Sequence, residues 1–184
     1  MNKFTRIVSW LFGILLIGLS LFVTAETASR KLFNISFQGA DELGGYVLAI
    51  GGALSFTVAL LERGHIRIDL LYDRMSPLLQ AVFNWLAAVV LAVLGVFLAR
   101  YCWLVIRDTI DYGSTAPTAW ATPLIYPQTL WYLCLLTFTL ASLLLAFKAS
   151  RHLFTGKIAQ LNATFHPKGA IEELNEELSD LKKR

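Results

Sequence analysis

The stretch LLQAVFNWLAAVVLAVLGVFLA, residues 78–99, decides the fold of this chain because it contains no charged residue. After Arg100 the apolar pattern continues to residue 106. A helix rises about 1.5 Å per residue, so a run of about 20 residues crosses the ~30 Å apolar core of a bilayer. Lipid offers no hydrogen bonds to the backbone, and a helix satisfies its backbone groups internally. Residues 78–106 are therefore predicted to span a membrane as a helix.

The remainder of the chain repeats this pattern. Of its 184 residues, 56% are hydrophobic and 16% are charged, whereas soluble domains average about 45–50% and about 25%. This composition excludes a soluble enzyme and predicts an all-α integral membrane protein. A four-helix transmembrane domain is expected over residues 1–154, followed by a tail over residues 155–184. The predicted spans are residues 7–25, 43–61, 78–106 and 128–147.

The first span has a second interpretation as a signal peptide. Lys3 and Arg6 precede it, and the triplet VTA at residues 23–25 resembles a cleavage site. The apolar run is, however, longer than the about 7–15 residues of a signal peptide. A retained helix is therefore preferred to a cleaved signal.

Two shorter helices are predicted outside the spans. After the second span, Gly64 permits a sharp turn, and the mixed apolar and charged residues that follow predict a short interfacial helix. Ser76 and Pro77 then fit the N-cap and first position of the third span. In the tail, apolar residues recur at helical spacing between glutamates, which predicts a cytoplasmic amphipathic helix. These residues are Ile171, Leu174, Leu178 and Leu181.

Lysine and arginine residues near the span ends predict the orientation, because cytoplasmic loops are enriched in them. With a cytoplasmic N-terminus, eight such residues lie inside and three lie outside, which favours both termini in the cytoplasm. The eight are Lys3, Arg6, Arg63, Arg67, Arg74, Lys148, Arg151 and Lys157, and the three are Arg30, Lys31 and Arg107. The net charge of +3 is too small to indicate a nucleic-acid partner.

The turn ERGHIRID, residues 62–69, is the most informative candidate site. Its candidate residues are Arg63, Gly64, His65, Arg67 and Asp69. The charged side chains are close enough in sequence to pair locally or with lipid phosphates, so the turn is interpreted as an architectural lock. The alternative, in which the histidine is a metal ligand or a proton relay, is less favoured because it stands alone beside arginines.

Three further residues are candidates for an interface. Glu42, with Asp41, opens the second span and complements the positive end of its helix dipole; a cap pair is favoured over a partner contact. Arg100 is a charge in an apolar context, and anchoring by snorkelling is favoured over a transport role. Trp120 lies in the loop at 108–127, which is rich in proline and aromatic residues, as a docking surface or a membrane anchor would be.

The sequence lacks the motifs of self-sufficient chemistry. It contains no G-x-x-x-x-G-K-[ST], H-E-x-x-H or C-x-x-C, its histidines lie outside the spans, and no acidic residue lies in mid-span. We therefore predict no enzyme activity, no catalytic residue, no metal and no cofactor. A subunit of a larger assembly is expected, and Gly44, Gly45, Gly51 and Gly52 are expected to pack on a larger partner. The alternatives are a stand-alone channel or carrier and a membrane assembly subunit unrelated to transport.

Several segments resemble one family, the small membrane subunit (DctQ-type, or Q subunit) of tripartite ATP-independent periplasmic (TRAP) transporters. They are RKLFN at residues 30–34, DEL at 41–43, and above all RGHIRIDL at 63–70, followed by Gly113, Pro117 and Pro123 before the fourth span. The resemblance covers residues 5–150. The tail from about residue 155 is not part of it.

The resemblance implies a heteromeric uptake system for organic acids in the bacterial inner membrane. A large multi-span subunit would carry the substrate and sodium sites and move as an elevator, while a periplasmic binding protein delivers the substrate. The small subunit would be a scaffold that braces the large one, contacts membrane lipids and helps dock the binding protein. It carries no catalytic residue over from the family.

Overall fold

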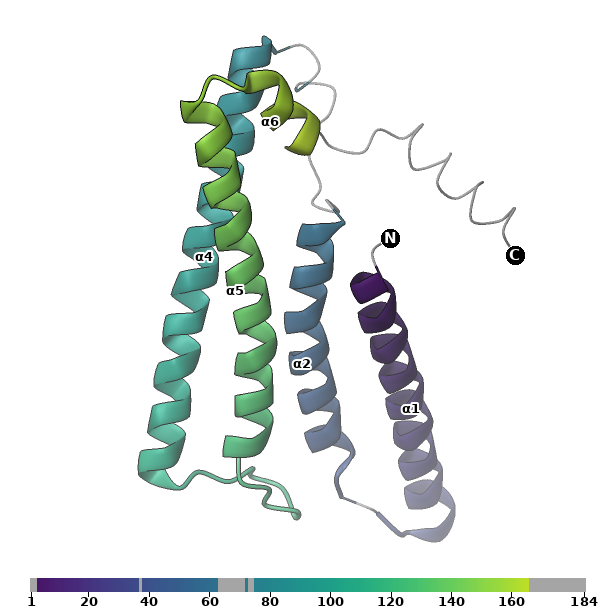
Figure 1. The fold of residues 1–184 in the computed structure, drawn as a ribbon. Coiled ribbons are helices and arrows are strands. Elements are labelled where there is room, and N and C mark those ends of the chain that lie inside the picture. The colour runs from purple at the N-terminus through teal and green to yellow at the C-terminus, as the bar shows by residue number, and fades with distance from the viewer. Residues whose placement is uncertain (1–2, 37, 63–71, 73–74, 166–184) are drawn as a thin grey trace, which may run out of the picture. The chain divides into compact units, whose positions relative to one another are not determined.

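The computed structural model describes residues 3–36, 38–62, 72 and 75–165, which are mainly helical and contain one isolated β-bridge. The helices are α1 (Lys3–Phe33), α2 (Ala40–Leu61), α4 (Pro77–Tyr112), α5 (Ile125–Phe154) and α6 (Ile158–Phe165), as Figure 1 shows. The four longer ones are apolar and long enough to cross a membrane, which confirms the predicted all-α fold with four spans. The tail helix and nearly all of the interfacial helix predicted from the sequence lie outside the described residues.

The spanning helices extend beyond the apolar runs that predicted them. Helix α1 continues eight residues past the predicted end at residue 25, to Phe33. In this extension the buried Glu26 carboxylate pairs with the Arg30 guanidinium at 2.8 Å and also accepts a hydrogen bond from the Ser36 hydroxyl. An ion pair four residues apart stabilises a helix by about 0.2–0.5 kcal/mol. Polar residues therefore prolong the helix after its hydrophobic stretch has ended.

Glycines end α4 and α5 in the same way. Gly113 and Gly156 have φ angles of 60° and 69°, a left-handed conformation that glycine adopts without steric cost. The residue after each glycine donates its amide to a carbonyl five residues earlier. These hydrogen bonds run from Ser114 to Thr109 at 3.1 Å and from Lys157 to His152 at 3.0 Å. This is the Schellman arrangement, which satisfies carbonyls at a helix end and turns the chain away.

The chain divides into two compact units, which are described separately. The first contains the described residues of Met1–Glu62 and Val93–Ala141, and the second contains those of Arg63–Ala92 and Ser142–Arg184. Helices α4 and α5 each pass through both units.

In the first unit, α1 and α2 lie side by side (Figure 1). The Thr5 hydroxyl donates to the Glu62 carboxylate at 2.7 Å, and the ring of Phe12 lies directly over Gly51. Gly51 thus packs within the chain, whereas it had been expected at a partner interface. A Cβ atom at Gly52 would meet open space, as it would at Gly44 and Gly45.

Helix α2 also packs on α5 in the first unit. The hydroxyls of Thr57 and Thr137 lie 2.9 Å apart, and the rings of Phe56 and Phe138 have centroids 5.8 Å apart. A buried cluster continues this contact to α4 and consists of Ala53, Cys102, Ile106, Cys134 and Leu135. One polar contact and a continuous apolar cluster therefore join α2 to the α4–α5 pair.

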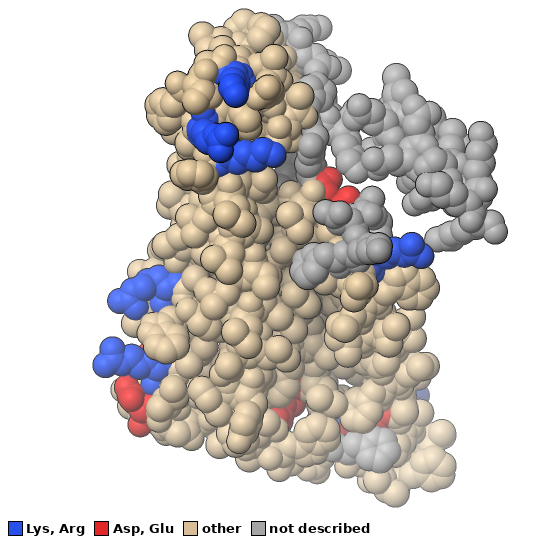
Figure 2. All heavy atoms as spheres, viewed as in Figure 1, with Lys and Arg blue, Asp and Glu red and all other residues tan. Residues whose placement is uncertain are grey.

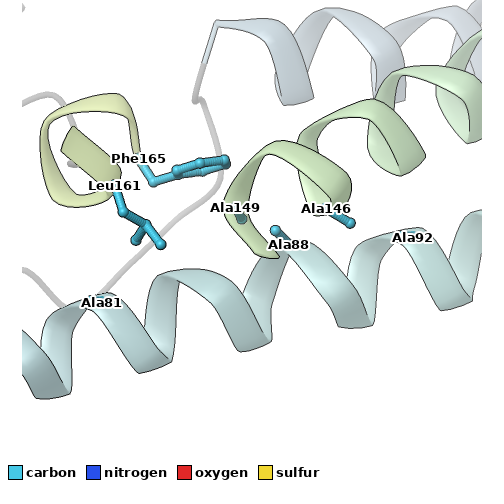
Figure 3. Packing of buried hydrophobic residues seen from close by; sticks show 7 residues of the cluster. All are labelled: Ala81, Ala88, Ala92, Ala146, Ala149, Leu161 and Phe165. Atoms are coloured by element: carbon cyan, nitrogen blue, oxygen red, sulfur yellow. The ribbon is translucent and has the colours of Figure 1, made fainter. Parts of the chain in front are cut away.

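In the second unit, small residues bring α4 and α5 close together. The buried cluster consists of Ala81, Ala88, Ala92, Ala146, Ala149, Leu161 and Phe165. Figure 3 shows Leu161 and Phe165 reaching from α6 toward the alanines of the two longer helices. Alanines permit the close backbone approach through which helices pack in a membrane. The Trp85 indole also donates to the Ser150 hydroxyl at 2.9 Å.

Large apolar side chains cover much of the surface. On the face that Figure 2 shows, the charged residues among those described occur in a few small groups. Helix α1 is the extreme case, because none of its most hydrophobic window is buried. Its exposed residues include Ile7, Trp10, Ile14, Ile17 and Leu21, each more than 60% exposed. A surface of this kind requires lipid or a protein partner.

Candidate functional site

The loop between α4 and α5 forms a small hairpin, residues 114–124, which we call the 114–124 hairpin. Thr115 and Pro123 form an antiparallel bridge, and the Ala116 amide donates to the Thr122 carbonyl at 2.9 Å. The hairpin closes where the Leu124 amide donates to the Ser114 carbonyl at 3.1 Å. The proline-punctuated segment therefore has a defined backbone.

Glu42 fixes this hairpin to the first turn of α2. Its carboxylate accepts hydrogen bonds from the hydroxyls of Thr118 and Tyr46, the latter at 2.9 Å, and Thr122 adds a further side-chain hydrogen bond. The residue is 6% exposed. A buried carboxylate is costly without such partners, and hydrogen bonds to a charged group are about twice as strong as neutral ones. Glu42 therefore joins parts of the chain that are 76 residues apart.

Trp120 packs on the same end of α2. Its indole lies directly against Gly39, where a Cβ atom would overlap the ring. Because Trp120 is nonetheless 47% exposed, the rest of its surface is available to another molecule. The neighbouring Ala121 has a φ of 47°, a conformation that costs a non-glycine residue about 1–3 kcal/mol and persists where surrounding contacts impose it. The hairpin thus holds Trp120 in one position.

The structure brings two of the predicted candidate residues together at this site. Glu42 was favoured as one of a pair of acids at the start of the second span, and Asp41 and Glu42 do lie in the first turn of α2, although the N-cap residue is Gly39 and no side chain caps the helix. The carboxylate of Glu42 turns to the hairpin that carries Trp120. This arrangement can support an interface, and no metal-binding group of three residues occurs in the part of the chain that is described.

The remaining candidates lie elsewhere or outside the described residues. Arg100 is exposed on α4 and lines a groove between α4 and α5. The architectural-lock residues Arg63, Gly64, His65, Arg67 and Asp69 fall outside the described part of the chain, so their role remains a prediction.

A polar cluster in the second unit was missed by the sequence analysis. Asn84, 1% exposed, donates to the Tyr72 hydroxyl at 2.7 Å and to the side-chain amide oxygen of Asn162 at 3.2 Å. Asn162 in turn donates to the Pro77 carbonyl at 2.9 Å. The available signal was Asn84 itself, because an amide in an apolar run requires a polar partner.

These features define a multi-pass helical membrane protein with a structured loop between α4 and α5. The family model for "Tripartite ATP-independent periplasmic transporters, DctQ component" matches residues 19–152. The chain belongs to this family and is a small permease component of a TRAP transporter. Comparison with curated proteins and with solved structures gives no significant match.

Proposed function

We propose that this chain is the scaffold of its transporter in the bacterial inner membrane. It braces a large, sodium-coupled elevator subunit and helps to dock a periplasmic protein that delivers an organic acid. The family match over residues 19–152 carries this proposal, because it identifies the chain as one component of a tripartite system. The sodium and substrate sites belong to the large subunit, so this chain needs no cofactor of its own.

The exposed face of α1 supports the bracing role. Ile7, Trp10, Ile14, Ile17 and Leu21 follow one another at alternating spacings of three and four residues. This spacing forms a continuous apolar seam along a helix, suited to packing lengthwise on a second helix. The large subunit is the proposed occupant of the seam.

The 114–124 hairpin supports the docking role. Glu42 anchors it by side-chain hydrogen bonds, and half of the Trp120 surface remains uncovered. Tryptophan is among the residues that contribute most at protein interfaces, and a rigid loop loses little entropy when it binds. The periplasmic binding protein is the proposed partner of this surface.

Reconstitution in proteoliposomes tests the proposal. Vesicles that contain both membrane subunits should accumulate substrate when the binding protein and an inward sodium gradient are supplied. Vesicles with this chain alone should show no flux, because its spans contain no mid-membrane acidic residue. Substrate flux through the chain alone would establish the rival, a stand-alone carrier or channel.

The same assay separates docking from bracing. Trp120→Ala should raise the concentration of binding protein needed for half-maximal uptake while leaving the maximal rate near that of the wild type. Tyr126→Ala is the matched control, since Tyr126 is an exposed aromatic residue just beyond the hairpin. Equal effects of the two substitutions would contradict docking at the hairpin.

A further inference from the structure

A groove between α4 and α5 combines a positive charge with apolar and aromatic side chains, and it has no part in the proposed bracing and docking roles. It has a volume of about 450 Å³ and lies within the first unit. Its lining residues are Val96, Ala99, Arg100, Trp103, Tyr132 and Thr139. Apart from the guanidinium of one arginine, this lining is mainly apolar and aromatic, so the groove is amphipathic.

The two ends of the groove differ in the side chains that line them. At one end, the rings of Trp103 and Tyr132 have centroids 5.9 Å apart. At the other end, the Thr139 hydroxyl donates to the Gly95 carbonyl at 3.0 Å. Tyr132 and Thr139 are two helical turns apart, a length of about 10 Å. Tryptophan and tyrosine concentrate at the level of lipid headgroups, so the groove leads from that level toward the membrane interior.

Arg100 supplies a positive charge close to the aromatic end. It is exposed, lies one turn from Trp103 on α4, and has no ion-pair partner among the described residues. A guanidinium within an apolar span is costly, by about 2.5–3.5 kcal/mol at the membrane centre. An anion at headgroup level removes much of that cost, and the planar guanidinium fork matches a phosphate group.

We propose that this groove is a binding site for an anionic phospholipid. The phosphate accepts hydrogen bonds from the Arg100 guanidinium, and one acyl chain lies along the apolar wall from Ala99 to Val96. A lipid fits better than a carboxylate of a protein partner, because the aromatic pair, the charge and the apolar wall follow the order of headgroup and tail. The leaflet concerned is the one nearer the C-terminal end of α4.

Native mass spectrometry of the intact membrane complex tests this site. The complex is equilibrated with phosphatidylglycerol and phosphatidylcholine, and the retained lipids are counted. Wild type should retain phosphatidylglycerol preferentially, and Arg100→Gln should weaken that retention about tenfold, as expected for the loss of a charge-assisted hydrogen bond. Arg107→Gln, the same change at an exposed α4 position outside the groove, should retain lipid as the wild type does.

A second variant tests the wall of the groove without altering charge. Val96 is 47% exposed, so Val96→Phe fills the groove from its rim and should also lower retention of phosphatidylglycerol. Equal retention by wild type and Arg100→Gln would overturn the proposal. Displacement of the lipid by inorganic phosphate alone would also overturn it, because Arg100 would then bind a free anion. Loss of the large subunit from Arg100→Gln with lipid retention unchanged would overturn it as well, because Arg100 would then bind the partner.

Discussion

At the scale of single residues, Gly51 has the sharpest role in the described structure. A Cβ atom at this position would overlap the ring of Phe12, so Gly51→Ala must displace that ring and loosen the contact between α1 and α2. Overpacking of this kind costs about 1–3 kcal/mol. We expect a lower midpoint of thermal unfolding for the purified chain in detergent.

Gly52→Ala is the matched control for this substitution. The same change at the next residue meets no atom within 4 Å. It should leave the unfolding midpoint unchanged or raise it slightly, because alanine restricts the unfolded chain more than glycine does. If both substitutions lowered the midpoint equally, the cause would be the loss of glycine from α2. The contact with Phe12 would then not explain the effect.

The candidate site was predictable residue by residue but not as an arrangement. Glu42 was recognised from its place at the start of a span, and Trp120 from its place in a proline-rich loop. Their common site depends on the hydrogen bond from Thr118 to Glu42, across 76 residues. Local sequence patterns describe neighbours three or four residues apart, and no such pattern encodes a contact of that separation.

At the scale of elements, the four spanning helices were predictable because hydrophobic length is a direct physical requirement of the bilayer. Their ends were not, since polar residues such as those near Glu26 continue a helix after the apolar run. Helix α6 was also missed, although Ile158, Leu161 and Phe165 already have helical spacing. Eight residues are too few for a stable helix in isolation, and packing on α4 and α5 supplies the stabilisation that the isolated helix lacks.

The attachment of α6 gives a prediction at this scale. Asn84→Ala removes the hydrogen bonds to Tyr72 and Asn162, and the loss of a buried partner costs about 1–3 kcal/mol. Amide hydrogen exchange in α6 should therefore accelerate about tenfold or more. Gln160→Ala, at an exposed position of α6, should leave that rate unchanged. Unaltered exchange in Asn84→Ala would show that the apolar cluster alone holds α6.

At the scale of the whole molecule, four candidate spans predict that the chain ends on the side of the membrane on which it starts. The excess of basic residues predicts that this side is the cytoplasm. A reporter fused at residue 115 should therefore be active only outside the cytoplasm, and one at the C-terminus only inside it. The opposite pattern would invert the orientation and remove the 114–124 hairpin from the periplasm, together with its docking role.

The hydrogen bond between Thr57 and Thr137 also has a consequence for the order in which the helices assemble. The two residues are 80 positions apart, and a ribosome adds about 5–20 residues per second. Thr57 is therefore synthesised about 4–16 s before its partner Thr137. During that interval α1 is the neighbour already available to α2, and the Thr57 hydroxyl can bond to the backbone of its own helix. The α1–α2 pair must consequently be stable in the bilayer on its own until α4 and α5 have been synthesised.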